Sequence, residues 1–112
     1  MIILGIDPGT VWVGYGVIEK RGHAFKTIDC GIIGDKDRDA MERLAYIGSE
    51  IKALIKKCGP DIIGIERIYF SKNKKTAISV AEARGVIVFV AKNMGIPILE
   101  FTPNDIKSVV AG

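Results

Sequence analysis

The sequence has few cysteines and no long hydrophobic run. Cys30 and Cys58 lie far apart with no paired spacing, which excludes a disulfide framework and a cysteine-based zinc site and favours a reducing compartment. The longest apolar run, from Gly85 to Ala91, is far too short to cross a bilayer. The N-terminus lacks the pattern of a signal peptide. We therefore predict a cytoplasmic protein with no membrane partner.

A strong excess of one charge is also absent. The formal net charge of +3 is too small to indicate a nucleic-acid partner by itself. Its distribution is more informative, because "SKNKK" gathers Lys72, Lys74 and Lys75 while "GDKDRDAME" gathers acids. Such a cluster is usually a solvated surface, so at this point it only raises the possibility of DNA or RNA binding.

The 112 residues, of which 48% are hydrophobic, are enough for one well-packed domain. Short apolar segments predict strands over residues 2–7, 13–20, 24–34, 61–66 and 96–101. The first three have short connections and should pair antiparallel, whereas strand, helix, strand implies a parallel crossover. The predicted fold class is α/β, with a mixed sheet of three antiparallel strands followed by two parallel strands, flanked by helices.

Helical spacing of apolar residues appears between these strands. In residues 38–60 the repeating positions are Met41, Leu44, Ile47, Ile51, Leu54, Ile55 and Cys58. Asp39 and Glu42 form a capping-box pattern, and Gly59 and Pro60 end the helix. Residues 76–93 predict a helix that is apolar nearly all round and buried, against another subunit in one interpretation. A last helix begins at Thr102.

Two of the predicted strands end on a carboxylate. Asp7 ends the first strand and Glu66 ends the strand over residues 61–66, and Gly5 and Gly64 each lie two positions earlier on the same strand face. If the two strands are parallel neighbours, both carboxylates lie at the C-terminal edge of the sheet, where α/β proteins commonly place their sites.

Neighbouring strands lie about 4.8 Å apart, so the two carboxylates could share one or two hard cations. Magnesium suits such all-oxygen sites and brings phosphate into its coordination shell. Gly9, Gly14 and Gly16 would let backbone approach an anion. The alternative is that Asp7 caps a turn and Glu66 pairs with a lysine, and spacing alone leaves both open.

The segment "RIYFSKNKK" shifts this balance towards function. It places Tyr69 and Phe70 beside the lysine cluster, which is the combination of aromatic platform and backbone-tracking charge that nucleic-acid grooves use. Phe70 also fits a core position, so Tyr69 is the better candidate for an exposed ring.

The motifs "ILGIDPGT", "GYGVI", "PDIIGIERIYFSKN", "AEARGV" and "TPNDIKSVV" occur in the order and spacing of a known family. In these motifs the chain resembles the RuvC Holliday junction resolvases, which have a ribonuclease H-like fold. The resemblance implies a homodimeric endonuclease that cuts four-way DNA junctions with paired symmetrical nicks, in homologous recombination and DNA repair. It also implies two Mg²⁺ ions per site, with Mn²⁺ as an alternative, and a branch-migration machinery as a partner.

The resemblance also implies roles for individual catalytic residues. Asp7 matches the carboxylate that bridges the metals, Glu66 the second metal ligand, and Lys107 a basic residue near the scissile phosphate.

Residues expected to contact DNA follow Glu66 in the sequence. Tyr69 matches the aromatic position that stacks on a base near the crossover, and Lys72 and Asn73 match the loop beside the DNA, which Lys74 and Lys75 extend. The family uses the segment over residues 76–93 in dimerisation.

One departure from the family concerns its last helix, which carries two more catalytic aspartates beyond the position of residue 112. No such pair occurs here, since the acids after Glu66 are Glu82, Glu100 and Asp105. We therefore expect a single RuvC-like nuclease domain over residues 1–112, truncated at its C-terminus. As given, it is expected to be inactive by itself and to have an apolar sheet face left uncovered.

Two alternatives come from other functional classes. One is a catalytically inactive module that binds junctions or dimerises. The other is an ATP-binding domain of the actin and sugar-kinase type, in which a turn similar to "GIDPGT" cradles phosphates.

Overall fold

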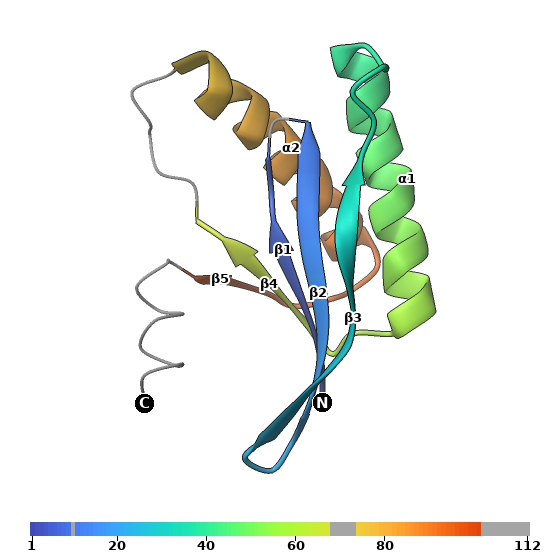
Figure 1. The fold of residues 1–112 in the computed structure, drawn as a ribbon, viewed down its shortest axis with the longest axis vertical. Coiled ribbons are helices and arrows are strands. Elements are labelled where there is room, and N and C mark those ends of the chain that lie inside the picture. The colour runs from blue at the N-terminus through green and yellow to red at the C-terminus, as the bar shows by residue number, and fades with distance from the viewer. Residues whose placement is uncertain (10, 68–73, 102–112) are drawn as a thin grey trace.

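The computed structural model describes residues 1–9, 11–67 and 74–101, with the side chains of 74 and 75 outside the description. Five strands form one sheet (Figure 1): β1 (Ile2–Asp7), β2 (Trp12–Arg21), β3 (Ala24–Gly34), β4 (Ile62–Glu66) and β5 (Ile98–Phe101). The helices are α1 (Ala40–Cys58) and α2 (Lys74–Asn93). All five strands and both of these helices lie where the sequence predicts them.

The order of strands in the sheet is β3-β2-β1-β4-β5. β1 pairs antiparallel with β2, and β2 pairs antiparallel with β3. Helix α1 then carries the chain to β4, which pairs parallel with β1, and α2 carries it to β5, which pairs parallel with β4. The predicted mixed α/β sheet is therefore confirmed.

Helix α1 begins and ends at the residues that its sequence indicates. The Asp39 side chain accepts a hydrogen bond from the Glu42 amide at 2.9 Å, as an N-cap does. Gly59 ends the helix in the left-handed conformation, with φ of 56°. Met41, the first of the apolar positions at this spacing, is 84% exposed, whereas Ile47, Ile51, Leu54 and Ile55 are buried.

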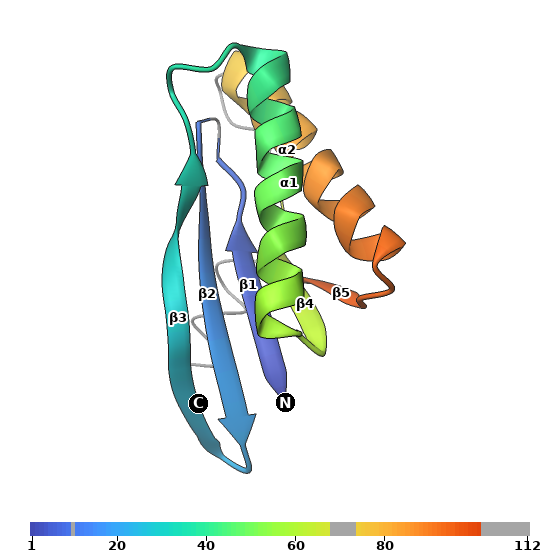
Figure 2. The ribbon, with the colours of Figure 1, turned by 90° about the vertical axis from the view of Figure 1, so that its right-hand side faces the viewer.

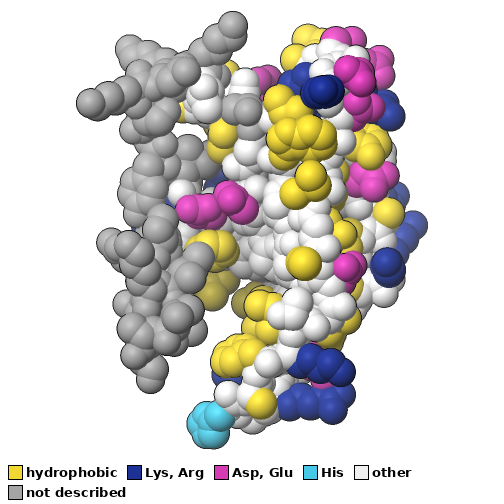
Figure 3. Space-filling view, viewed as in Figure 1, with side chains coloured by type: hydrophobic (Ala, Val, Ile, Leu, Met, Phe, Trp, Pro, Cys, Tyr) yellow, Lys and Arg dark blue, Asp and Glu magenta, His cyan; other side chains and the backbone are white. Residues whose placement is uncertain are grey.

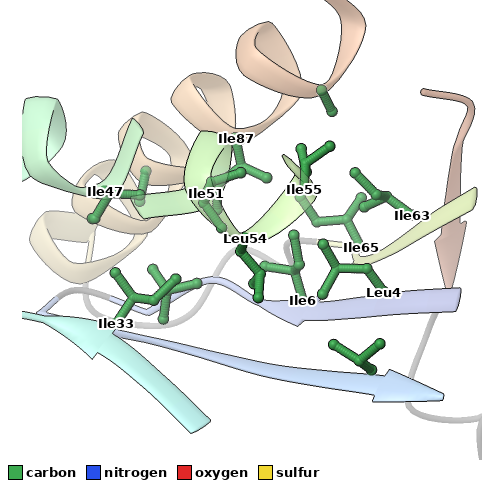
Figure 4. Close-up of a cluster of buried hydrophobic side chains, with 14 residues drawn as sticks. Leu4, Ile6, Ile33, Ile47, Ile51, Leu54, Ile55, Ile63, Ile65 and Ile87 are labelled. Atoms are coloured by element: carbon green, nitrogen blue, oxygen red, sulfur yellow. The ribbon is translucent and has the colours of Figure 1, made fainter. Parts of the chain in front are cut away.

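Both described helices pack on the same face of the sheet (Figure 2). Leu4 and Ile6 of β1 and Ile63 and Ile65 of β4 point to this face and are almost fully buried. They meet side chains from α1, including Ile51, and from α2 in one continuous core (Figure 4). Strand alternation therefore directs residues 3, 5 and 7 of β1 to the opposite face.

That opposite face is covered by neither α1 nor α2. It carries large exposed apolar side chains, including Trp12, Ile32 and Leu99. Figure 3 shows apolar side chains on this face around a small acidic group over the ends of β1 and β4. Among the described elements, the expected uncovered apolar face is therefore present.

Helix α2 differs from its expected all-round burial. Ala83, Ile87 and Ala91 face the core, while Ile78 and Phe89 are more than 60% exposed. Within the described residues, neither α1 nor α2 is long and apolar enough to span a membrane.

Candidate metal site at the sheet edge

Asp7 and Glu66 end two strands that lie side by side. In the parallel pair of β1 and β4, Gly5 is opposite Gly64 and Ile6 is opposite Ile65. Asp7 and Glu66 are the next residues on the two strands, so both emerge at the C-terminal edge on the face away from the helices. The predicted juxtaposition of the two carboxylates is confirmed.

The two carboxyl groups interact directly. A hydrogen bond with Asp7 raises the pKa of Glu66 above its ordinary value, and partial burial and the negative charge of Asp7 raise it further. A hydrogen bond between two carboxyl groups requires a proton on one of them, because two carboxylates have acceptors only. Glu66 thus holds a proton, or a cation in its place, more readily than a carboxyl group without such a neighbour.

Glycines surround Asp7 on its face of the sheet. Asp7 lies opposite Gly14 in β2, and Gly5 lies opposite Gly16. A side chain at Gly16 would meet no atom within 4 Å, so the backbone there is open to a ligand. Gly9 has a different role, since a Cβ at that position would lie 2.2 Å from the Trp12 carbonyl oxygen. The close approach of the Trp12 carbonyl therefore requires a glycine at position 9 on steric grounds.

Gly64 is not open either. The ring of Phe101, from β5, lies 3.4 Å from the place that a Cβ of Gly64 would occupy. The missing side chain in β4 thus leaves space for the ring of Phe101, the residue opposite Glu66 in the register.

No positive side chain offsets this carboxylate pair within the described ranges. The ion pairs found there use other acids, and Arg67, directly after Glu66, pairs with Glu100. The alternative that a lysine pairs with Glu66 has no support in residues 1–9, 11–67 and 74–101. These residues also contain no group of three or more potential metal ligands. The pair by itself offers a divalent cation up to four carboxylate oxygens, which fits the preference of magnesium.

Comparison with known proteins identifies the family. A family model described as "Crossover junction endodeoxyribonuclease RuvC" matches residues 3–112. The chain belongs to the RuvC family. A RuvC of Petrotoga mobilis, named crossover junction endodeoxyribonuclease, is 47% identical over 100% of this chain and 69% of its own length. The RuvC of Moorella thermoacetica is 44% identical over 100% of this chain and 68% of its own length.

The fold also matches a solved RuvC structure. The T. thermophilus RuvC in complex with Holliday junction substrate superimposes with a TM-score of 0.91, covering 99% of this chain and 72% of that one. At 23% identity this likeness establishes the fold.

Other RuvC-like site residues from the sequence are not brought into this geometry. Tyr69, Lys72, Asn73 and Lys107 lie outside the described residues. The backbones of Lys74 and Lys75 form the beginning of α2. The proposed roles of these residues stay predictions.

Sequence reasoning missed a group of three charged residues at the same end of the sheet as the pair, on the helix-covered face. The Arg67 Nε donates to Glu100 Oε2 at 3.1 Å, and the Arg84 guanidinium donates to the other Glu100 oxygen. These residues lie 33 and 16 positions apart, so no local spacing indicates the contact. The parallel pairing of β4 with β5 is what brings them together.

We expect Glu66→Gln to stabilise the metal-free protein at neutral pH. The raised pKa of Glu66 means that its charged form is disfavoured in the folded protein. The wild type is therefore destabilised at pH values above 4.5, the ordinary pKa of a glutamate. Because solvent screens the pair, we expect the substitution to raise the free energy of unfolding by about 0.5 kcal/mol. This corresponds to a rise in Tm of about 2–4 °C.

The higher stability of Glu66→Gln should disappear as the pH falls below 4.5, because the wild-type carboxyl is then protonated in both the folded and the unfolded state. Thermal unfolding in EDTA across pH 3–8 measures this difference in Tm, with Glu50→Gln, an exposed acid in the middle of α1, as the control. A lower Tm for Glu66→Gln at pH 7 would contradict the repulsion argument.

Proposed function

We propose that this protein is a metal-dependent endonuclease that resolves four-way DNA junctions by paired symmetrical nicks. The observation that carries the proposal is the uncompensated Asp7–Glu66 pair on adjacent parallel strands, in a chain that matches the RuvC family from residue 3 to residue 112. Relatives with 41–47% identity bear the name crossover junction endodeoxyribonuclease.

In this proposal Asp7 and Glu66 hold Mg²⁺, with Mn²⁺ as a substitute. A bound divalent cation supplies an activated water and stabilises the leaving oxygen of the phosphodiester. The open backbone at Gly16 leaves room for DNA on the same face as the two carboxylates. Lys107 is the proposed basic catalytic residue near the scissile phosphate, and the proposed DNA contacts are completed by Tyr69, Lys72, Asn73, Lys74 and Lys75. Cytoplasm is the proposed location, and a branch-migration machinery remains an expected further partner.

The test is nicking of a synthetic four-way junction with labelled strands in Mg²⁺, alongside a linear duplex of the same sequence. Nicks in two strands of like polarity, on the junction and not on the duplex, would show that Asp7 and Glu66 suffice for cutting, against the expectation that the 112 residues are inactive by themselves. Equal cutting of both substrates would contradict junction selectivity. Selective binding to the junction with no nicks would instead assign the inactive binding module, and no binding to either DNA would overturn the proposal.

We further propose that the protein acts as a homodimer through the outer face of α2. Ile78, Ala81, Gly85 and Phe89 are exposed and follow helical spacing along this face. No atom lies within 4 Å of a Cβ placed on Gly85, so a second helix has space to approach there. A two-fold axis would present the same face from both subunits and would match the two related scissile strands of a junction.

Phe89→Ser should weaken this dimer by at least about tenfold, because the largest apolar side chain of this face, 67% exposed, is lost. Sedimentation equilibrium measures the dissociation constant. Phe25→Ser is the matched control, since Phe25 is 58% exposed on the β2–β3 hairpin, away from α2. A wild-type monomer at high concentration, or equal effects of both variants, would contradict the proposed interface.

A further inference from the structure

One carboxylate, Glu100 of β5, joins the end of β4 to α2 on the helix-covered face of the sheet, at the strand ends whose opposite face carries Asp7 and Glu66. Its Oε2 accepts from the Nε of Arg67, which directly follows β4, at 3.1 Å. Its other oxygen accepts from the guanidinium of Arg84, in the third turn of α2. The two arginines hold the pKa of Glu100 below its ordinary value, so the carboxylate stays ionised at neutral pH.

Arg67 is held by its backbone as well. Its amide donates to the Phe101 carbonyl oxygen at 2.8 Å, which continues the β4–β5 pairing one residue past Glu66. Main chain and side chain of Arg67 are thus both bound to β5. The residue immediately before this doubly held position is Glu66.

A strand end that carries Glu66 needs such an anchor. Asp7 and Glu66 are like charges in direct contact when neither holds a proton, and their repulsion favours movement of one strand end away from the other. Asp7 precedes the turn that returns into β2, which restrains β1. Among the described elements β4 is followed by α2 rather than by a paired strand, and there its restraint beyond the sheet ladder comes from Arg67 and Glu100.

We infer that Glu100 is a positioning residue for the Asp7–Glu66 pair: through Arg67 it holds the end of β4 so that Glu66 stays beside Asp7, and through Arg84 it ties this strand end to α2. This inference rests on the proposed metal site. An isolated surface ion pair contributes little to stability. Here one carboxylate is shared by two arginines, of which Arg84 is only 23% exposed, and the role concerns geometry rather than stability.

Binding of Mn²⁺ to the metal-free protein tests the inference without any need for activity. The free ion is counted by its electron paramagnetic resonance signal. We expect Glu100→Gln to raise the Kd for Mn²⁺ about 3- to 10-fold. Residues that orient metal ligands change metal affinity by similar or larger factors when they are replaced. Glu19→Gln is the matched control, because Glu19 also pairs with an arginine and its loss changes the net charge equally, but it lies on the β2–β3 hairpin.

Arg67→Met separates positioning from simple electrostatics. Removing a positive charge next to a cation site strengthens cation binding if charge alone acts. Loss of the anchor weakens it, and we expect a Kd raised about 3-fold or more. The double variant that combines Arg67→Met with Glu100→Gln should bind Mn²⁺ no more weakly than the weaker-binding of the two single variants, because both residues act through one ion pair. Glu100→Asp, which keeps the charge, should recover part of the affinity.

The outcomes distinguish this inference from the proposed function. If Asp7→Asn weakens Mn²⁺ binding while Glu100→Gln and Arg67→Met bind as the wild type does, the positioning role is overturned and the metal site stands. Tighter binding by Arg67→Met, or equal losses in Glu100→Gln and Glu19→Gln, would also overturn it. If Asp7→Asn leaves Mn²⁺ binding unchanged, the proposed metal site fails and this inference fails with it.

Discussion

Asp7→Asn is expected to reduce the rate of Mg²⁺-dependent junction nicking at least about a hundredfold. Charge stabilisation by a bound metal contributes several kcal/mol to such reactions, and each 1.36 kcal/mol is a factor of ten in rate. Asparagine keeps the size of the side chain but offers a neutral oxygen. Because Glu66 is the other carboxylate of the pair, the variant would keep one charged ligand where the wild type has two.

The same substitution should leave folding and junction binding in EDTA intact, because Asp7 is exposed and its charge is repelled by Glu66. Single-turnover cleavage measures the nicking rate. A gel-shift series in EDTA measures junction binding, and thermal unfolding measures the stability of the fold. Asp37→Asn, which removes an exposed charge before α1, serves as the control. Nicking by Asp7→Asn at the wild-type rate would show that the cutting does not depend on this pair.

The pair itself was predictable from the sequence because strands alternate with a period of two. Apolar runs that end on Asp7 and Glu66, with Gly5 and Gly64 two positions earlier, indicate matching faces and matching ends. The structure places the two glycines opposite each other in the register of β1 and β4. What the pattern could not predict is that Gly64 is covered by Phe101, because that contact depends on the neighbouring strand.

Helix α2 shows another limit of sequence patterns. Its apolar residues occupy nearly every side, so periodicity indicates no particular core face. Packing against the sheet and α1 selects Ala83, Ile87 and Ala91 for burial, and it leaves Phe89 outside. The clustering of Arg67, Arg84 and Glu100 is equally invisible to local spacing. Long-range contacts that depend on strand order are thus what the sequence alone leaves undetermined.

The second large effect concerns stability. Ile51→Ala is expected to lower the free energy of unfolding by about 2–5 kcal/mol, since it removes a buried side chain and leaves a cavity. Ile51 is 0% exposed in the middle of α1, where it meets both the sheet and α2 in the single core cluster (Figure 4). No second core within the described residues can compensate, so the loss applies to the whole fold.

Met41→Ala on the same helix is the matched control. Met41 is 84% exposed, and its truncation should change the free energy of unfolding by no more than about 0.5 kcal/mol. Urea unfolding followed by circular dichroism gives both values, and equal slopes with urea for the two variants would confirm that they differ only in stability. If both variants unfolded at the same urea concentration as the wild type, α1 would not be docked on the sheet. The parallel crossover that places β4, and with it Glu66, beside β1 would then lose its physical basis.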